Sequence, residues 1–282
     1  MDRAGSLPPG YRLLGALGRG GDGQTFLATD RLGRRVVLKR AYHQGKAERD
    51  KVQMEARMMA SIDHAHVARI YTVEWWQGRW LLVMEFVSGE DLASKLSTSG
   101  PLRPYGLALG LAVQLVNGLA AVWEAGLVHR DVKPANVIVD DHGVAKLIDF
   151  GLAVPADSPP PGTSKPKGSA YYVPPERILK QHEDFRGDIY SAGIILFEML
   201  VGQPPFREGG ADAIAAAHVT RRVPRVDALR SSVPGPLVSL VAAMTRRRPA
   251  ERPSSYGELL DEMERVVAYI DRRSAGQEIP SA

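Results

Sequence analysis

Short runs of apolar residues, separated by turn residues such as Gly33, occupy the first 86 positions of the chain. The runs at residues 11–17, 25–29 and 35–40 predict β-strands. Two further runs, 67–76 and 79–86, flank the turn sequence Gln-Gly at 77–78 and predict a β-hairpin. The early part of the chain is therefore expected to be rich in strands.

One helix is expected among these strands, at residues 47–61. Val52, Glu55, Met59 and Ile62 recur at steps of three and four residues, so they share one face of that helix. A carboxylate within an apolar stripe is unusual, and it makes Glu55 a candidate functional residue.

The pattern changes near residues 86–89, after which helical periodicity dominates. Short strands are expected only around 137–139 and 145–148, and the polar, proline-rich stretch 158–167 is expected to be a loop. The predicted helices are at residues 92–97, 105–124, 188–201, 211–219, 236–245 and 254–270. Residues 271–282 are expected to form a tail.

Composition limits the classes of protein that remain. Hydrophobic residues make up 44% and charged residues 24% of the 282, as in a soluble globular protein. The absence of cysteine excludes disulfides, zinc–thiolate sites and thiol nucleophiles, and it fits a cytoplasmic protein. A net charge of +4 is explained by a solvated surface without a nucleic-acid partner. The one dense basic run, Arg246 to Arg248, is interpreted as a structural or solvated turn.

Residues 105–123 carry no formal charge and are long enough to cross a membrane. However, Gln114 and Asn117 interrupt the segment and three glycines weaken it, so a helix buried in a domain is expected and no membrane span. The first residues, MDRAGSLPPGYRL, have no apolar stretch before the prolines and do not predict a secretory signal.

Two motifs in the strand-rich part carry candidate chemistry. Gly18, Gly20 and Gly23 form a GxGxxG turn between expected strands, where backbone N–H groups can approach phosphates closely. Taken alone, this turn is equally well a flexible hairpin. Lys39 ends the apolar strand VVLK, and a lysine there is ordinarily solvated unless a carboxylate such as Glu55 holds it.

Two more motifs follow, HRDVKPAN at 129–136 and DFG at 149–151. In this order and approximate spacing, the four motifs resemble the signature set of protein kinases. GSAYYVPPE at 168–176 resembles the GT…APE end of a kinase activation segment, and DIYSAG at 188–193 resembles the DxxSxG start of the central helix. The glycine-rich and HRD motifs are most similar to bacterial Hanks-type serine/threonine kinases.

The resemblance implies an α+β, bilobal protein-kinase fold. The catalytic domain would cover residues 11–270, after an extension at 1–10. Its β-rich N-lobe with one main helix would be residues 11–86, and its larger, mainly helical C-lobe residues 88–270.

The resemblance also assigns roles in phosphoryl transfer from ATP, residue by residue. Lys39 would bind the α- and β-phosphates and be oriented by Glu55. Asp131 would orient the substrate hydroxyl or accept its proton, and Lys133 would steady the γ-phosphate. The metal would be Mg²⁺, with Mn²⁺ as the alternative ion, and its ligands are Asn136 and Asp149.

The adenine would bind to backbone near Glu85 and Val87, with Met84 as the gatekeeper, and Asp91 would meet the ribose. The three glycines of the GxGxxG turn would cover the phosphates. Two residues depart from the usual pattern of this pocket, Thr25 in place of valine and Val37 in place of alanine. We expect a changed nucleotide affinity or inhibitor fit from them rather than lost binding.

Arg130 would pair with a phosphorylated residue of the activation segment, as in similar kinases. Thr163 and Ser164 are the expected sites of an activating autophosphorylation, although a passive polar loop is the alternative. Ser169 stands where the family has a threonine that contacts the catalytic loop. Arg252 matches the arginine that usually pairs with the APE glutamate, here Glu176.

Protein substrates are the expected partners. Dimerisation through the front lobe is known in the family, and it would give a homodimer for autophosphorylation, although no residue of this sequence establishes it. Two other interpretations stay open: a pseudokinase scaffold, and a small-molecule phosphotransferase. Lys39, Asp131 and Asp149 argue against the first, and Lys133, Ser169 and Glu176 against the second. Many bacterial relatives continue into a membrane span and an outer sensor domain, so the chain is either a soluble enzyme or the kinase part of a longer protein.

Overall fold

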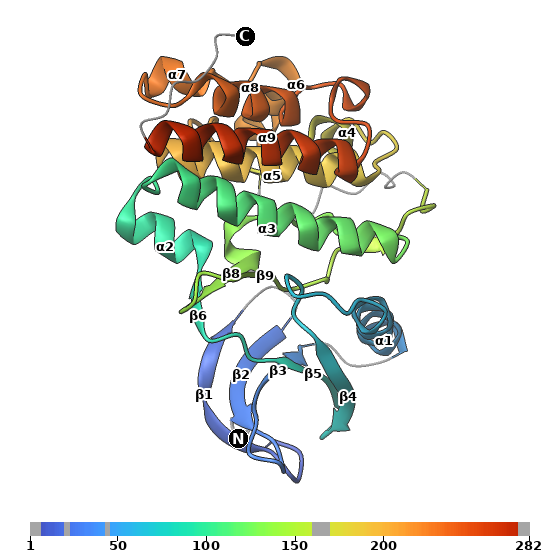
Figure 1. Ribbon diagram of the computed structural model, residues 1–282. Helices are drawn as coiled ribbons and strands as arrows, with labels where there is room; N and C mark the ends of the chain where they lie inside the picture. Colours follow the sequence, from blue (N-terminus) through green and yellow to red (C-terminus); the bar gives the residue numbers. More distant parts are fainter. Residues whose placement is uncertain (1–6, 20–22, 43–45, 160–169, 276–282) are drawn as a thin grey trace. The chain divides into compact units, whose positions relative to one another are not determined.

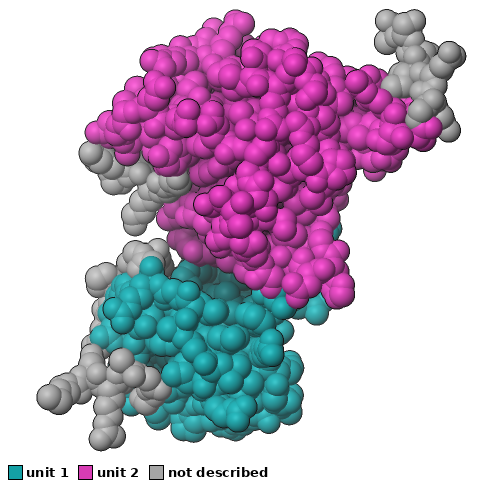
Figure 2. Space-filling model, turned by 90° about the vertical axis from the view of Figure 1, so that its left-hand side faces the viewer, with its two compact units in different colours: residues 1–88 teal, residues 89–282 magenta. Residues whose placement is uncertain are grey.

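The computed structural model describes residues 7–19, 23–42, 46–159 and 170–275. Figure 1 shows the order and arrangement of the elements within each part of the chain. The chain divides into two compact units, residues 1–88 and residues 89–282 (Figure 2). The first unit is rich in strands and the second is mainly helical, which confirms the predicted α+β class.

The first unit contains a five-stranded antiparallel sheet in the order β1-β2-β3-β5-β4. Helix α1 (Lys46–Ala60) contacts β4 and β5. The strands are β1 (Arg12–Arg19), β2 (Gly23–Thr29), β3 (Arg35–Ala41), β4 (Ile70–Trp76) and β5 (Arg79–Glu85). β4 starts three residues later than predicted, after a turn in which the amide of Val67 donates to the carbonyl of His64 at 3.1 Å.

The two faces of this sheet differ in character because successive side chains of a strand point to opposite faces. One face holds a cluster of fully or almost fully buried residues: Ala28, Val36, Leu38, Leu81 and Val83. The other face carries Thr25 opposite Lys39 on β2 and β3, and Val37 opposite Met84 on β3 and β5. The sheet therefore presents Lys39 beside the two residues that depart from the usual kinase pattern.

The second unit is built around helix α5 (Phe185–Val201), which is buried on nearly all sides and apolar along most of its length. Helix α3 (Tyr105–Glu124) packs against both α5 and α9 (Tyr256–Ser274), and α5 packs against α8 (Gly235–Met244) (Figure 1). The remaining longer helices are α2 (Leu92–Ser99) and α6 (Ala211–Thr220).

Helix α9 runs to Ser274, four residues past its predicted end. Arg272 and Arg273 lie in its last turn, where positive side chains interact favourably with the helix dipole. The tail expected from residue 271 therefore begins as helix.

Among the described residues, α3 is the one helix that is long and apolar enough to cross a membrane. Nine of its residues are buried within the second unit. Length and composition of this kind are also found in the central helices of globular domains, and the packing of α3 against α5 and α9 matches that case.

Several short elements were not predicted: β6 (Gly89–Asp91), β7 (Leu127–Val128), β10 (Val154–Pro155), α4 (Pro175–Ile178), α7 (Val226–Leu229) and the 3₁₀ turns η1 (Pro134–Asn136) and η2 (Pro249–Glu251). β6 joins β8 (Val137–Asp140) and β9 (Ala145–Leu147) in a three-stranded sheet, and β7 pairs with β10. Runs of two to four residues carry little periodicity, so tertiary pairing rather than local pattern determines them.

Candidate active site

The first unit places Lys39 and Glu55 in an ion pair, with Lys39 Nζ 2.9 Å from Glu55 Oε1. Lys39 projects from β3 on the face opposite the apolar cluster, and Glu55 lies on the buried side of α1. Their side chains are only 17% and 7% exposed, so water screens the pair weakly. The carboxylate in the apolar stripe thus has a defined partner.

The glycine-rich turn lies between β1 and β2, with Gly18 in β1 and Gly23 as the first residue of β2. A Cβ atom on Gly23 would lie 2.3 Å from the carbonyl oxygen of Arg40, so the close approach of β2 to β3 requires glycine there. A Cβ on Gly18 would meet no atom within 4 Å. Gly20 lies outside the described residues.

The candidate adenine-contacting segment follows β5. Glu85 pairs with Val36, and its amide donates to the carbonyl of Arg69 at 2.8 Å. Val87 is buried. In the second unit, Asp91 caps α2: its Oδ1 accepts from the amide of Ser94 at 2.9 Å and its Oδ2 from the Ser94 hydroxyl at 2.7 Å. A role in capping was not foreseen, and a ribose contact of Asp91 stays a prediction.

Asp131 is the centre of a group of hydrogen bonds in the second unit. Lys133 Nζ lies 2.6 Å from Asp131 Oδ2, and Asn136 Nδ2 donates to the same oxygen at 3.0 Å. Asn136 Nδ2 also donates to the Asp131 carbonyl at 2.8 Å. Within the described part of the chain both side-chain contacts fall on Oδ2, so Oδ1 is the oxygen better placed to receive a proton from a substrate hydroxyl.

Asn136 and Asp149 lie at the same end of the β8–β9 hairpin. The strands pair Val137 with Leu147, and the amide of Ile148 donates to the Asn136 carbonyl at 2.9 Å. Asp149 has a φ of +64°, a conformation that is uncommon for residues other than glycine and that is concentrated at functional sites.

These donors fit a magnesium ion. Asn136 and Asp149 offer an amide oxygen and a carboxylate, and Mg²⁺ is typically held by one or two carboxylates together with phosphate and water oxygens. In the described ranges no group of three or more His, Cys, Asp or Glu residues could hold a metal by itself. The residues therefore suit an ion that arrives with a nucleotide.

The backbone that carries Asp131 is anchored by Asp188 of α5. Asp188 accepts hydrogen bonds from the amides of His129 at 2.7 Å and Arg130 at 2.9 Å, one on each carboxylate oxygen. Arg130 has a φ of +64°. Burial and then the charge of Glu183 raise the pKa of Asp188 to about 7. The anchor thus holds an uncommon backbone turn directly before Asp131.

His129 is fully buried against Phe150, with ring centroids 4.7 Å apart in an edge-to-face contact. Burial lowers the pKa of His129 to about 4, so the ring is neutral near pH 7. Its Nδ1 accepts a hydrogen bond from the Asp131 amide at 3.2 Å. The HRD and DFG segments are therefore packed against each other.

Arg130 has a partner that the sequence did not indicate. Its Nε lies 3.6 Å from Glu183 Oε2, and the Glu183 side chain is fully buried. Arg177 Nε donates to the same glutamate at 2.7 Å, and a second nitrogen of Arg177 donates to the Arg130 carbonyl. Burial alone would lower the pKa of Arg177, but hydrogen bonds and the charge of Glu183 raise it.

Glu176 and Arg252 form a buried two-pronged ion pair, with N–O distances of 2.6 and 2.8 Å. The guanidinium also donates to the carbonyls of Arg186, Arg246 and Arg247 at 2.7, 2.7 and 3.0 Å. The pair connects α4 to the residue that directly follows η2, and the bonds of Arg252 to the Arg246 and Arg247 carbonyls extend the connection to the segment between α8 and η2. Thr163, Ser164 and Ser169, the hydroxyl residues expected in the activation segment, lie outside the described residues.

Sequence reasoning missed Glu183 and Arg177 as members of this group. Glu183 belongs to the polar stretch QHED before α5, which gives no sign of burial. Arg177 directly follows the expected APE glutamate, and only the fold turns it toward Arg130.

Residues 11–263 match the family model described as the protein kinase domain. The chain therefore belongs to the protein kinase family.

Its curated relatives include bacterial proteins of about 31% identity. It is similar to "Serine/threonine-protein kinase PknE" of Mycobacterium tuberculosis, 31% identical over 270 residues, which are 94% of this chain and 47% of the relative. It is also similar to "Serine/threonine-protein kinase PknH" of Mycobacterium bovis, with 31% identity over 262 residues, which are 91% of this chain and 44% of the relative. A third relative is "Probable serine/threonine-protein kinase pknA2" of Bifidobacterium longum, with 31% identity over 268 residues, which are 92% of this chain and 35% of the relative. The chain thus spans less than half the length of each of these relatives.

Proposed function

We propose that this protein transfers the γ-phosphate of ATP to serine and threonine hydroxyls of proteins in bacterial signalling. The observation that carries the proposal is the hydrogen-bonded group of Asp131, Lys133 and Asn136, held beside Asp149 by the β8–β9 hairpin. The serine/threonine kinases named above support the choice of acceptor. Lys133, two residues after Asp131, supports it as well, because tyrosine kinases usually differ there.

In this proposal Asp131 orients the acceptor hydroxyl and takes its proton at Oδ1. Lys133 then stabilises the negative charge that develops on the transferred phosphoryl group. Asn136 and Asp149 hold Mg²⁺, which offsets the charge of the phosphate oxygens when it is bound. Lys39, kept in place by Glu55, neutralises the α- and β-phosphates. All of these residues are proposed to serve one nucleotide.

The further elements of the proposal follow the sequence expectations. The catalytic domain is residues 11–270, Gly18, Gly20 and Gly23 cover the phosphates, and Glu85, Val87 and Asp91 contact the nucleoside. The protein acts in the cytoplasm on protein substrates, and a homodimer supports autophosphorylation at Thr163 or Ser164. The modification is proposed because Arg130 directly precedes Asp131; the Arg130 guanidinium also lies 3.6 Å from the buried Glu183, which would share it with a phosphate.

Transfer of ³²P from labelled ATP, to the protein itself and to lysate proteins, tests the proposed function. We expect phosphoserine and phosphothreonine from the wild type, and a rate lower by about 10²–10⁴ for Asp131→Asn, because a positioned acid–base group is lost. Equal signals from both proteins would favour a pseudokinase scaffold. Transfer to a sugar or amino alcohol with none to protein would favour a small-molecule phosphotransferase.

A further inference from the structure

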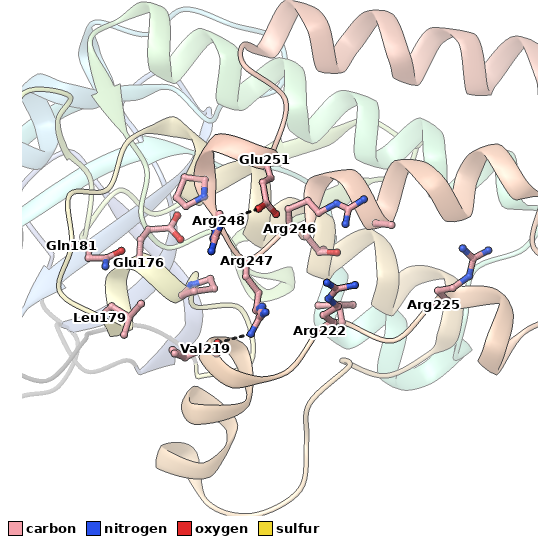
Figure 3. Close-up of a pocket in the computed structure, with 15 residues that line it drawn as sticks. Glu176, Leu179, Gln181, Val219, Arg222, Arg225, Arg246, Arg247, Arg248 and Glu251 are labelled. Atoms are coloured by element: carbon pink, nitrogen blue, oxygen red, sulfur yellow. Dashed lines mark hydrogen bonds and ion pairs between the residues drawn. The ribbon is translucent and has the colours of Figure 1, made fainter.

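A basic cavity of about 780 Å³ lies in the second unit, away from Asp131 and its neighbours in sequence. It is bounded by α4, the α6–α7 connection and the α8–η2 connection (Figure 3). Five arginines line it against two glutamates. The arginines are Arg222, Arg225, Arg246, Arg247 and Arg248. Three of them form the run that the sequence analysis interpreted as a structural or solvated turn.

The backbone of that run is fixed before any ligand binds. Arg252, itself buried, donates to the carbonyls of Arg246 at 2.7 Å and Arg247 at 3.0 Å, and it is bound in turn to Glu176. The Arg247 side chain donates to the carbonyls of Val219 and Thr220 at 3.4 and 3.2 Å. The rim of the cavity is therefore held in place by hydrogen bonds, those of Arg252 partly or fully buried and those of Arg247 exposed, which lowers the entropic cost of binding.

The charges of the cavity are only partly compensated. Arg225 is bound to Asp227 at 2.6 Å, and Arg248 lies 3.7 Å from Glu251. Glu176 is already paired with Arg252. Within the described residues, Arg222 and Arg246 make no side-chain hydrogen bond or ion pair, and Arg247 contacts only neutral carbonyl oxygens. The guanidinium groups of Arg222, Arg246 and Arg247 thus have no acidic partner within the described residues, and they can bind an anion in the cavity.

We infer that this cavity is a docking site for an acidic segment of a protein substrate. Carboxylates are matched by guanidinium groups, which bind them with two parallel hydrogen bonds. Leu179, whose side chain is half exposed, and Val223 add an apolar part to the lining, which suits a segment of mixed acidic and apolar residues. The arginines gather in one hollow rather than along an extended face, which favours a peptide over a nucleic acid.

The position of the cavity fits this occupant. Pro175 and Glu176 of α4 line it, and these two residues are also the last of the stretch 168–176 that resembles the end of a kinase activation segment. The inference rests on the proposed function, because only a kinase that acts on proteins has a protein substrate to dock. An acidic segment held here would raise the local concentration of the acceptor hydroxyl.

Binding of a fluorescein-labelled, glutamate-rich peptide that contains leucine tests the inference by fluorescence anisotropy. The protein is the full chain at about 0.05 M salt, where exposed charges are screened least. The double variant Arg222→Gln/Arg246→Gln is expected to bind the peptide about tenfold or more weakly than the wild type. Arg272→Gln/Arg273→Gln, at the exposed end of α9, removes the same charge and is expected to change the affinity less than twofold.

Equal losses in the two double variants, or equal binding of a peptide with glutamine in place of glutamate, would overturn the inference. Tighter binding of duplex DNA or of anionic lipid vesicles, lost in Arg222→Gln/Arg246→Gln, would assign the cavity to a different partner. The assay requires no catalysis. If the wild type phosphorylates proteins but does not bind the peptide, only the docking inference fails; if it binds the peptide but transfers no phosphate, the proposed function fails.

Discussion

At the scale of single residues, Glu183 links the proposed phosphorylation of the activation segment to Asp131, through Arg130. A buried carboxylate between Arg130 and Arg177 already supplies negative charge to the arginine that precedes Asp131. A phosphate on the activation segment would meet the same guanidinium. Activity should therefore depend less on that phosphate than it would if Arg130 had no internal acid.

Because Glu183 and the phosphate would share Arg130, substitutions at the two places should have non-additive effects on the rate of phosphoryl transfer. Thr163→Ala/Ser164→Ala is expected to reduce the transfer rate modestly in the wild-type background and far more in a Glu183→Gln background, since residues of one charge network are coupled by about 1–2 kcal/mol. Initial rates of ³²P transfer for the four proteins measure this coupling.

Thermal melts of all four proteins show whether each is folded at the assay temperature. Strictly additive effects on the rate would contradict a shared role at Arg130. Full activity of Thr163→Ala/Ser164→Ala in both backgrounds would remove the activating autophosphorylation altogether.

The sequence could predict those site residues that stand out in a local pattern or belong to one motif. Glu55 stood out because its charge interrupts an apolar stripe, and the structure pairs it with Lys39. Asp131, Lys133 and Asn136 fall within one eight-residue motif, and they contact one another. Glu183 could not be indicated in this way, because its burial depends on how α4 and α5 pack.

At the scale of elements, the ion pair of Glu176 and Arg252 holds α4 against the end of η2. Its side chains are 2% and 0% exposed. Arg252→Ala should lower the free energy of unfolding by about 3–5 kcal/mol, because it leaves a buried carboxylate and three carbonyls without their donor. Denaturant unfolding measures this loss.

The matched control is Arg248→Ala, which removes an exposed arginine 3.7 Å from Glu251. Its effect should stay within about 0.5 kcal/mol. A comparable loss in the two variants would mean that the buried pair does not stabilise α4.

The buried His218 of α6 should make the free energy of unfolding depend on pH. It is fully buried beside Phe206, and the Tyr190 hydroxyl lies 2.7 Å from its Nδ1. Burial lowers its pKa from 6.5 to about 4. Between those pH values the unfolded state binds more protons, so the free energy of unfolding should fall as the pH falls, by at most about 1.4 kcal/mol per pH unit for this group.

Denaturant unfolding at pH 6.5 and 5 measures the effect. His218→Gln is expected to fall less steeply in stability than the wild type over this interval, whatever its stability at pH 6.5. The control is His142→Gln, a change at an exposed histidine, which should keep the wild-type slope. A wild-type slope in His218→Gln would contradict a neutral buried His218.

Elements with strong periodicity were predictable and short ones were not. The expected helix at 105–124 and the hairpin turn at 77–78 have the predicted bounds. β6, β7 and β10 have two or three residues each and exist because a partner strand lies beside them. β4 starts three residues later than predicted, and α9 ends four residues later than predicted.

At the scale of the whole molecule, the proposed chemistry needs residues of both units. Lys39 and Glu55 belong to the first unit, while Asp131, Asn136 and Asp149 belong to the second. In the proposal, both sets contact the same triphosphate and its metal. The central claim is therefore that a single magnesium-bound nucleotide contacts Lys39, Asn136 and Asp149 together.

A crystal structure with Mg²⁺ and a non-hydrolysable ATP analogue tests that claim most directly. It should show Lys39 Nζ within hydrogen-bond distance of the α- or β-phosphate, and Asn136 and Asp149 as oxygen ligands of a magnesium ion on the same nucleotide. A nucleotide bound elsewhere, or one that contacts Lys39 while the metal is held without Asn136 and Asp149, would contradict it.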